Sequence, residues 1–219
     1  NFKFDERGVA PLHYVDDSTA VMELYHGPTL AFKDVALQIL PHFIKHAKIK
    51  ENETATILIL VATSGDTGKA ALEGFSDVEG MGISVFFPNQ GVSKMQQLQM
   101  TTQEGKNVFV CAVNGNFDDA QTGVKKIFAD SGITAELLKQ NIKLSSANSI
   151  NWGRLVPQVV YYFSAYADML KDKKIVLGDK VNFVVPTGNF GDILAGYYAM
   201  KMGLPINKLI CASNENKVL

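Results

Sequence analysis

Strand-like apolar runs alternate with amphipathic helix-like segments along the whole of this chain. The run Thr56–Ala62 is continuous, apolar and rich in β-branched residues, which predicts a strand buried on both faces of a sheet. Further strands are predicted at Val21–Tyr25, Gly82–Phe87, Asn107–Val113, Ile142–Ser145, Asn182–Val185 and Lys208–Ala212. Helices are predicted at Lys33–Lys48, Lys69–Phe75, Ser93–Thr101, Phe117–Ala129, Thr134–Gln140, Ile150–Leu170 and from the Gly188 loop to Met202. This alternation predicts an α/β fold with a largely parallel sheet.

A polar patch at Ser146–Asn151 interrupts this pattern and predicts the seam between two halves of the chain. The first half, residues 1–148, holds most of the predicted parallel strands. The second half, residues 149–219, begins with the long aromatic helix and ends in a strand-like run. Because the chain starts at Asn1 and stops just after that run, we expect it to be part of a longer protein, truncated at both ends.

Lys33 opens the first predicted helix and lies on its apolar face. In helical steps it shares that face with Leu37, Leu40 and Ile44. With Thr29 as the predicted N-cap, the ammonium lies in the first turn, where burial and the helix dipole both disfavour its charge. Only a neutral amine attacks a carbonyl, so Lys33 is a candidate Schiff-base lysine. The alternative is a lysine that extends along the helix flank to water.

Two loops between a predicted strand and a predicted helix have compositions typical of anion binding. The loop Thr63–Lys69 offers backbone N–H groups and small hydroxyls, which suit an anion or a carboxylate. It is not a nucleotide P-loop, because Thr63 stands where the first glycine is needed and Ala70 follows the lysine. The loop Pro186–Asp192 has two glycines that let N–H groups converge on a phosphate. On composition alone, the first loop is equally compatible with an ordinary capped turn, and the second is a weak signal.

A third polar cluster precedes the long aromatic helix. Arg154 lies about one turn into that helix and can face back towards Asn148 and Ser149, which predicts a clamp for a phosphate or carboxylate. The alternative is an N-cap followed by a surface arginine. One phosphorylated aldehyde cofactor and an anionic amino-acid substrate would together use all of these features: the imine-forming lysine, the carboxylate loop, the phosphate loop and the second anion site. Pyridoxal 5'-phosphate is therefore the predicted cofactor.

The composition of the chain limits the kinds of binding partner and cellular compartment that we expect for it. Hydrophobic residues make up 47% and charged residues 20% of the chain, as in an ordinary soluble globular protein. The net charge of −1 gives no reason to expect nucleic acid or an anionic membrane as partner. Cys111 and Cys211 form no CxxC or Cys/His cluster, so we expect no metal site and a reducing, cytoplasmic location. Neither a signal peptide nor a membrane span is predicted.

Four long motifs, in order along the chain, resemble the threonine synthase family of fold-type II pyridoxal-phosphate enzymes. They are ELYHGPTLAFKD (Glu23–Asp34), ATSGDTGKAA (Ala62–Ala71), SANSINWGRL (Ser146–Leu155) and PTGNFGDILAGY (Pro186–Tyr197). The aspartate in the SGDTG loop is closer to the bacterial and fungal members than to the plant type. The resemblance implies a three-layer αβα fold with mostly parallel sheets, like that of the tryptophan synthase β subunit.

The resemblance also implies a reaction and a set of site residues. Members of the family are phosphate-eliminating lyases. They convert O-phospho-L-homoserine and water to L-threonine and phosphate, which is the last step of threonine biosynthesis. Lys33 is implied to be catalytic, because it carries the cofactor and moves protons. The implied cofactor-binding residues are Lys33, Asp66, Gly188, Asn189, Phe190 and Gly191. The implied substrate-binding residues are Ser64, Gly65, Thr67, Asn148, Ser149 and Arg154.

Two other functions stay open at this stage. A different fold-type II lyase, such as a threonine or serine dehydratase, would keep the lysine and the glycine loop. A catalytically inactive relative could serve as a binding module. We also expect the 219-residue chain to be inactive alone, because family members continue well beyond Leu219. A homodimer is one option for its assembly.

Overall fold

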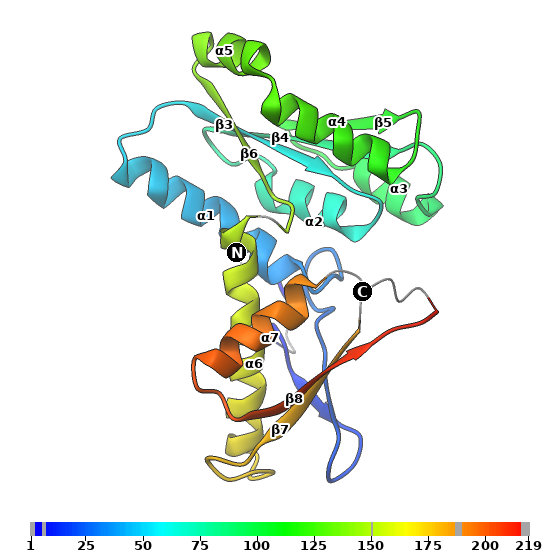
Figure 1. The fold of residues 1–219 in the computed structure, drawn as a ribbon, viewed down its shortest axis with the longest axis vertical. Helices are drawn as coiled ribbons and strands as arrows, with labels where there is room; N and C mark the ends of the chain where they lie inside the picture. The colour runs from blue at the N-terminus through cyan, green and yellow to red at the C-terminus, as the bar shows by residue number, and fades with distance from the viewer. Residues whose placement is uncertain (1–2, 6–7, 150, 187–189, 216–219) are drawn as a thin grey trace. The chain divides into compact units, whose positions relative to one another are not determined.

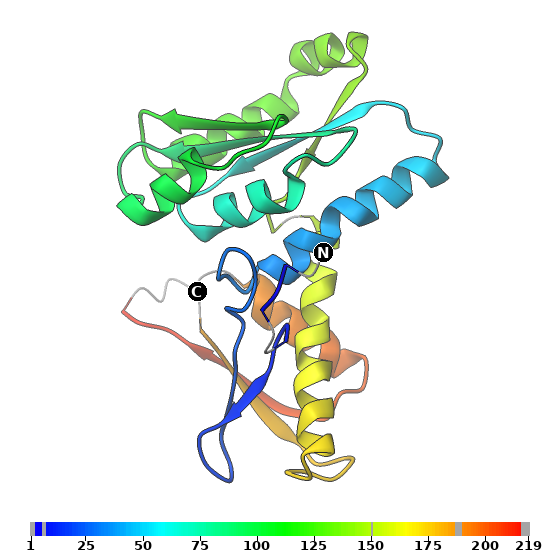
Figure 2. The same cartoon turned by 180° about the vertical axis from the view of Figure 1, so that it is seen from behind.

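The computed structural model describes residues 3–5, 8–149, 151–186 and 190–215. The chain divides into two compact units, one formed by Gly27–Arg154 and the other by Asn1–His26 together with Leu155–Leu219. Figures 1 and 2 show the elements of each unit from opposite sides. The two-segment division predicted from the sequence, 1–148 and 149–219, stays a prediction.

A four-stranded parallel sheet forms the centre of the Gly27–Arg154 unit. Its strands are β3 (Thr56–Ala62), β4 (Met81–Pro88), β5 (Val108–Val113) and β6 (Ile142–Ser146), in the order β5-β4-β3-β6. Helices α1 (Asp34–Lys50), α2 (Asp66–Phe75) and α3 (Lys94–Thr101) contribute to the core on one face of this sheet. Helices α4 (Phe117–Ala129) and α5 (Ser131–Lys139) follow β5, and α4 covers the opposite face (Figure 1). The unit is therefore a three-layer αβα arrangement with parallel strands, as the family resemblance implies.

Strand β3 contributes to both cores because its side chains alternate between the two faces of the sheet. Ile57, Ile59 and Val61 pack with α1 and α2, whereas Leu60 and Ala62 pack with α4. A strand covered on both faces needs apolar residues at every position, which explains its continuous run of apolar residues. The predicted bounds of this strand are confirmed.

The described residues of the other unit form two small sheets and two helices. Strands β1 (Leu12–Tyr14) and β2 (Ala20–Met22) form an antiparallel pair, and β7 (Val181–Pro186) pairs in parallel with β8 (Ile206–Ala212). Helix α6 (Trp152–Lys171) enters this unit at Leu155, and α7 (Gly191–Lys201) follows β7.

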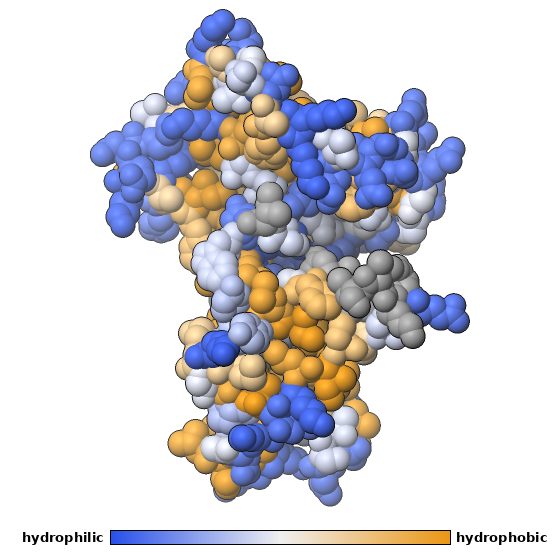
Figure 3. Space-filling view, in the orientation of Figure 1, coloured by the Kyte–Doolittle hydropathy of each residue, from blue (hydrophilic) through white to orange (hydrophobic). Residues whose placement is uncertain are grey.

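Tyr162 ties α6 to the start of α7 within this unit. Its hydroxyl donates to the Asp192 carbonyl at 2.6 Å, and its ring packs edge-on against Phe183 with the centroids 4.8 Å apart. The face that carries α7 and β8 presents apolar residues, as Figure 3 shows. Leu194 and Ile210 are among the exposed apolar residues of these elements.

The predicted elements differ from the observed ones mainly at their ends. Helix α2 begins at Asp66 rather than Lys69, because the polar residues after β3 already belong to its first turn. Strand β1, which the sequence does not predict, has only three residues, too few for its alternation to stand out in the sequence. No helix within the described residues has the length and hydropathy needed to cross a membrane.

Candidate functional site

The site lies where the strand order of the four-stranded sheet reverses. From β3 the chain adds β4 and then β5 on one side, and β6 then pairs with the other side of β3. In parallel α/β sheets, ligands bind beyond the carboxyl ends of the two strands at such a reversal. Here those ends lead into the loop Thr63–Gly65 and the segment Ala147–Asn151. The sheet thus brings together two polar clusters that lie more than eighty residues apart in sequence.

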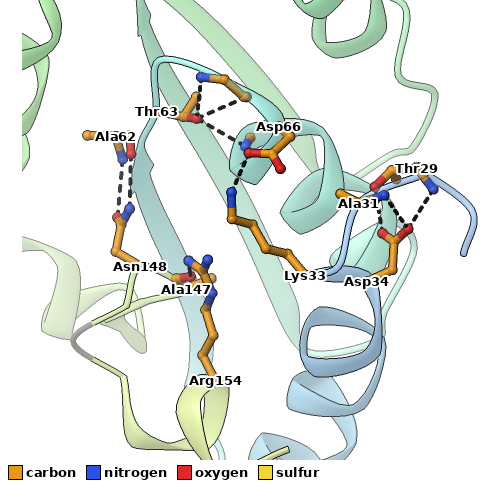
Figure 4. Close-up of polar contacts among 12 residues, drawn as sticks. Thr29, Ala31, Lys33, Asp34, Ala62, Thr63, Asp66, Ala147, Asn148 and Arg154 are labelled. Carbon is orange, nitrogen blue, oxygen red and sulfur yellow. Dashed lines mark hydrogen bonds and ion pairs between the residues drawn. The ribbon is translucent and has the colours of Figure 1, made fainter. Parts of the chain in front are cut away.

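Asn148 bridges the ends of β3 and β6. Its Nδ2 donates to the Ala62 carbonyl at 3.0 Å, and the Ala62 N–H donates to its Oδ1 at 3.3 Å (Figure 4). This side-chain pairing extends the ladder between the two strands past the last backbone pair. Asn148 therefore fixes the distance between the two loops, a role that sequence spacing alone does not reveal.

Thr63 organises the loop that precedes α2. Its buried hydroxyl accepts hydrogen bonds from the Gly65 and Gly68 N–H groups, each at 3.2 Å, and donates to the Gly65 carbonyl at 3.1 Å. The helix N-cap, Gly65, contributes no side-chain cap. The sequence places Thr63 in a candidate anion-binding loop but does not predict its role as the acceptor that shapes the loop. A threonine between a buried strand and a glycine-rich turn is nevertheless a signal for this kind of loop bond.

Replacing Thr63 by valine is expected to lower the free energy of unfolding by about 1–3 kcal/mol, because the buried Gly68 N–H and the half-buried Gly65 N–H lose their acceptor. Thr63→Ser keeps the hydroxyl and should stay within about 1 kcal/mol of the parent. Urea unfolding followed by circular dichroism measures both. A loss in Thr63→Ser with none in Thr63→Val would mean that packing of the methyl group, and not the hydroxyl, stabilises the loop.

Lys33 is buried, with 8% of its surface exposed, so it does not extend along the helix flank to water. Its Nζ donates to the Asp66 carboxylate at the start of α2 (Figure 4). The same nitrogen lies 5.0 Å from the centroid of the Phe32 ring. The neutral form of this amine stays a prediction.

The predicted N-cap of this helix is wrong. Helix α1 begins at Asp34, and Lys33 itself occupies the N-cap position without a side-chain cap. The Thr29 hydroxyl does not cap the helix backbone, because it donates to the Asp34 carboxylate at 2.5 Å.

Arg154 is also buried, with 2% of its surface exposed, so the alternative of a surface arginine is wrong. Its Nη1 donates to the Ala147 carbonyl at 2.9 Å. Burial lowers the pKa of the guanidinium to about 10, and the Asp66 carboxylate opposes that shift. Since this value is still well above 7, Arg154 remains a cation at neutral pH. Asp66 thus lies beside two basic side chains: it pairs with the Lys33 amine and opposes the pKa shift of Arg154.

The remaining predicted site residues divide between the two units. In the Gly27–Arg154 unit, Ser64 and Ser149 are exposed, and Gly65 and Thr67 are half-buried. In the other unit, Phe190 is the N-cap of α7 and Gly191 is its first residue, so this loop lies between a strand and a helix as predicted. Gly188 and Asn189 lie outside the described residues. No group of three or more His, Cys, Asp or Glu side chains that could hold a metal ion occurs in the described part of the chain.

Known proteins similar in sequence to this chain include threonine synthases and threonine synthase-like proteins. No family model matches the chain. Human threonine synthase-like 1 is 46% identical over 217 residues, which cover 96% of this chain and 29% of that protein. The threonine synthase of Pseudomonas aeruginosa is 45% identical over 216 residues, which cover 99% of this chain and 44% of that protein.

Solved structures agree with these sequences. The crystal structure of threonine synthase from Brucella melitensis with bound PLP has 45% sequence identity and a TM-score of 0.83, and the match covers 98% of this chain and 44% of that one. Yeast threonine synthase has 40% identity and a TM-score of 0.81, with 99% of this chain and 43% of that one covered. The chain spans less than half the length of these relatives, and it belongs to the threonine synthase family.

Proposed function

We propose that this chain supplies the lysine-bearing part of the active site of a threonine synthase, an enzyme that converts O-phospho-L-homoserine and water to L-threonine and phosphate. The observation that carries the proposal is the buried Lys33, whose amine is directed at Asp66 where the strand order reverses. A buried lysine is uncommon unless it is paired or reactive. Because the chain spans 44% of the Pseudomonas aeruginosa enzyme, the activity belongs to the whole protein.

The proposed cofactor is pyridoxal 5'-phosphate, the group bound in the Brucella melitensis structure. When bound, it supplies an aldehyde that links to amines and a ring that withdraws electrons from the α-carbon of the substrate. The Lys33 amine, enclosed by protein and paired with a carboxylate, suits the aldehyde end. We assign Lys33 and Asp66 to that end of the cofactor. The phosphate group is assigned to the loop residues Gly188, Asn189, Phe190 and Gly191.

The roles proposed for the site residues follow from their charge and from their hydrogen-bonding groups. Lys33 removes the α-proton of the substrate and later returns a proton, because its amine is the basic group at the site. Ser64, Gly65 and Thr67, in the loop held by Thr63, bind the α-carboxylate. Arg154 binds the departing phosphate together with Ser149 and the loop that Asn148 holds. A buried guanidinium facing developing negative charge is worth about 2–4 kcal/mol of transition-state stabilisation.

Chemical labelling of the full-length protein tests the lysine. We expect pyridoxal phosphate followed by borohydride reduction to leave a pyridoxyl group on Lys33, mapped by peptide mass spectrometry. An exposed lysine such as Lys139 in α5 serves as the internal reference for non-specific labelling. Labelling only at the level of Lys139 would instead favour the inactive binding module.

Turnover separates the two enzymatic alternatives. The full-length protein should form threonine and phosphate from O-phospho-L-homoserine. A dehydratase of the same fold would release ammonia from threonine or serine and leave O-phospho-L-homoserine unchanged. The test is therefore a comparison of O-phospho-L-homoserine, threonine and serine as substrates of one preparation of the protein.

Arg154→Lys keeps a cation at this position but removes the planar pair of donors. We expect KM for O-phospho-L-homoserine to rise by roughly 10–100-fold and inhibition by inorganic phosphate to weaken in parallel, since a charge-assisted bidentate contact is lost. Circular dichroism checks that the helix is intact. An unchanged KM would remove Arg154 from the substrate site and favour a lyase that acts on an unphosphorylated amino acid.

We further propose a cytoplasmic location, because Cys111 and Cys211 are both free and exposed, which suits a reducing compartment. The homodimer stays a prediction, and light scattering of the full-length protein tests it.

A further inference from the structure

The position of Lys33 depends on a short loop that the next residue in the chain holds in place. Asp34, the first residue of α1, is 1% exposed. Its Oδ1 accepts a hydrogen bond from the Thr29 hydroxyl at 2.5 Å, and its Oδ2 accepts the N–H groups of Thr29 at 2.9 Å and Ala31 at 3.3 Å (Figure 4). One buried carboxylate thus receives three donors from the segment that leads into Lys33.

This loop is conformationally strained at its centre. Leu30 has a φ of 59°, in the left-handed region that a bulky residue seldom adopts, and its side chain is 70% exposed. No burial of that side chain compensates for the unusual backbone. The two N–H groups that Asp34 accepts belong to the residues on either side of Leu30, so the carboxylate stabilises the strained conformation directly.

The start of the loop is equally restricted. A Cβ added to Gly27 would lie 2.4 Å from Asp34 Oδ2 and 2.6 Å from Asp34 Cβ. The Leu30 N–H donates to the Gly27 carbonyl at 3.1 Å, which closes the turn. Only a glycine therefore lets the carboxylate approach the turn closely enough to accept all three donors.

Capping this loop with a buried Asp34 carboxylate costs desolvation free energy. Burial raises the pKa of its carboxyl and the negative charge of Glu73 adds to that rise, whereas the hydrogen bonds from Thr29 and Ala31 oppose it. An exposed serine or aspartate would cap an ordinary turn without desolvating a charge. Lys33 Nζ is paired with Asp66, so Asp34 acts on the lysine through the backbone of the loop.

We propose that Asp34 is a positioning residue for Lys33: by holding Gly27–Ala31 in its strained form, it directs the lysine amine at Asp66. The positioning follows from the geometry of the loop. Only its consequence for catalysis rests on the proposed function of Lys33.

Asp34→Asn tests this proposal, because asparagine keeps the size of the side chain but replaces one acceptor oxygen by a donor. The matched control is Asp118→Asn, which changes an exposed aspartate in the first turn of α4. In the cofactor-free full-length protein, we expect Asp34→Asn to raise the rate of Lys33 acetylation by acetic anhydride about tenfold relative to Lys139, because the loop opens more often. We also expect amide exchange at Thr29 and Ala31 to accelerate by a similar factor. The control should change neither rate.

Catalysis provides a separate readout. If Lys33 has the proposed role, Asp34→Asn should lower kcat about tenfold or more, as a misplaced catalytic group does, while KM changes less than threefold. Altered acetylation and exchange with unchanged kcat would uphold the positioning and contradict the role of Lys33. Unchanged acetylation and exchange in a folded Asp34→Asn protein would overturn the inference.

A second pair of variants covers the case in which Asp34→Asn does not fold. Thr29→Val removes one of the three donors, whereas Thr29→Ser retains it. We expect the valine variant to speed both acetylation of Lys33 and exchange at Ala31, and the serine variant to match the parent. Equal rates in the two variants would likewise overturn the inference.

Discussion

Replacing Lys33 by alanine in the full-length protein is expected to slow the formation of threonine by about ten-thousand-fold, the scale of losing an essential proton-transfer group. The amine is enclosed by protein, paired with Asp66 and placed at the sheet reversal. In the proposed reaction it both holds the cofactor and moves the α-proton, so its loss removes two functions at once. The measurement is phosphate release from O-phospho-L-homoserine.

Two further variants make this result specific. Lys33→Arg places a guanidinium beside Asp66 but provides no amine that can link to an aldehyde, so it should be as inactive as Lys33→Ala. Lys139→Ala changes an exposed lysine of α5 and should leave turnover unchanged. Substantial activity in Lys33→Arg would mean that the lysine is only the partner of an ion pair, and the proposed mechanism would be wrong.

Local sequence patterns were sufficient for elements whose burial is complete or whose caps are strong. The bounds of β3 follow from its unbroken apolar run. The start of α4 follows from the polar turn that contains Asn116, whose side chain forms a capping box with Asp119. In both cases the signal lies within the element itself, so no tertiary information is needed.

The arrangement of the site could be predicted only in part. The clusters at Thr63–Lys69 and around Arg154 were recognisable by composition, but their meeting depends on β6 pairing with β3, which local pattern does not specify. Thr29 was predicted as an N-cap, whereas its hydroxyl binds Asp34 instead. Such competition between nearby acceptors depends on the exact path of the loop, so the positioning roles of Asp34 and Thr63 emerge only from the structure.

Gly74→Ala is expected to lower the free energy of unfolding by about 3 kcal/mol or more, the upper end for overpacking a core. Gly74 lies in α2 where this helix crosses α1, and a Cβ there would be 2.2 Å from the Leu37 carbonyl oxygen. That oxygen belongs to the backbone of α1 and cannot turn aside as the end of a side chain can. The helices must therefore separate, which also loosens the packing of Leu37 and Phe75 in the core.

Gly123→Ala is the matched control, because Gly123 lies in the interior of α4 and an added Cβ would meet no atom within 4 Å. Alanine there should raise the free energy of unfolding by about 0.5–1 kcal/mol, since it restricts the unfolded chain without a clash. The two variants thus make the same chemical change with opposite expected signs, and urea midpoints with unchanged slopes report both. A Gly74→Ala protein as stable as Gly123→Ala would mean that α1 and α2 have room to move apart at little cost. The close crossing of these helices, on which the separation of Lys33 and Asp66 depends, would then not be a rigid feature of the fold.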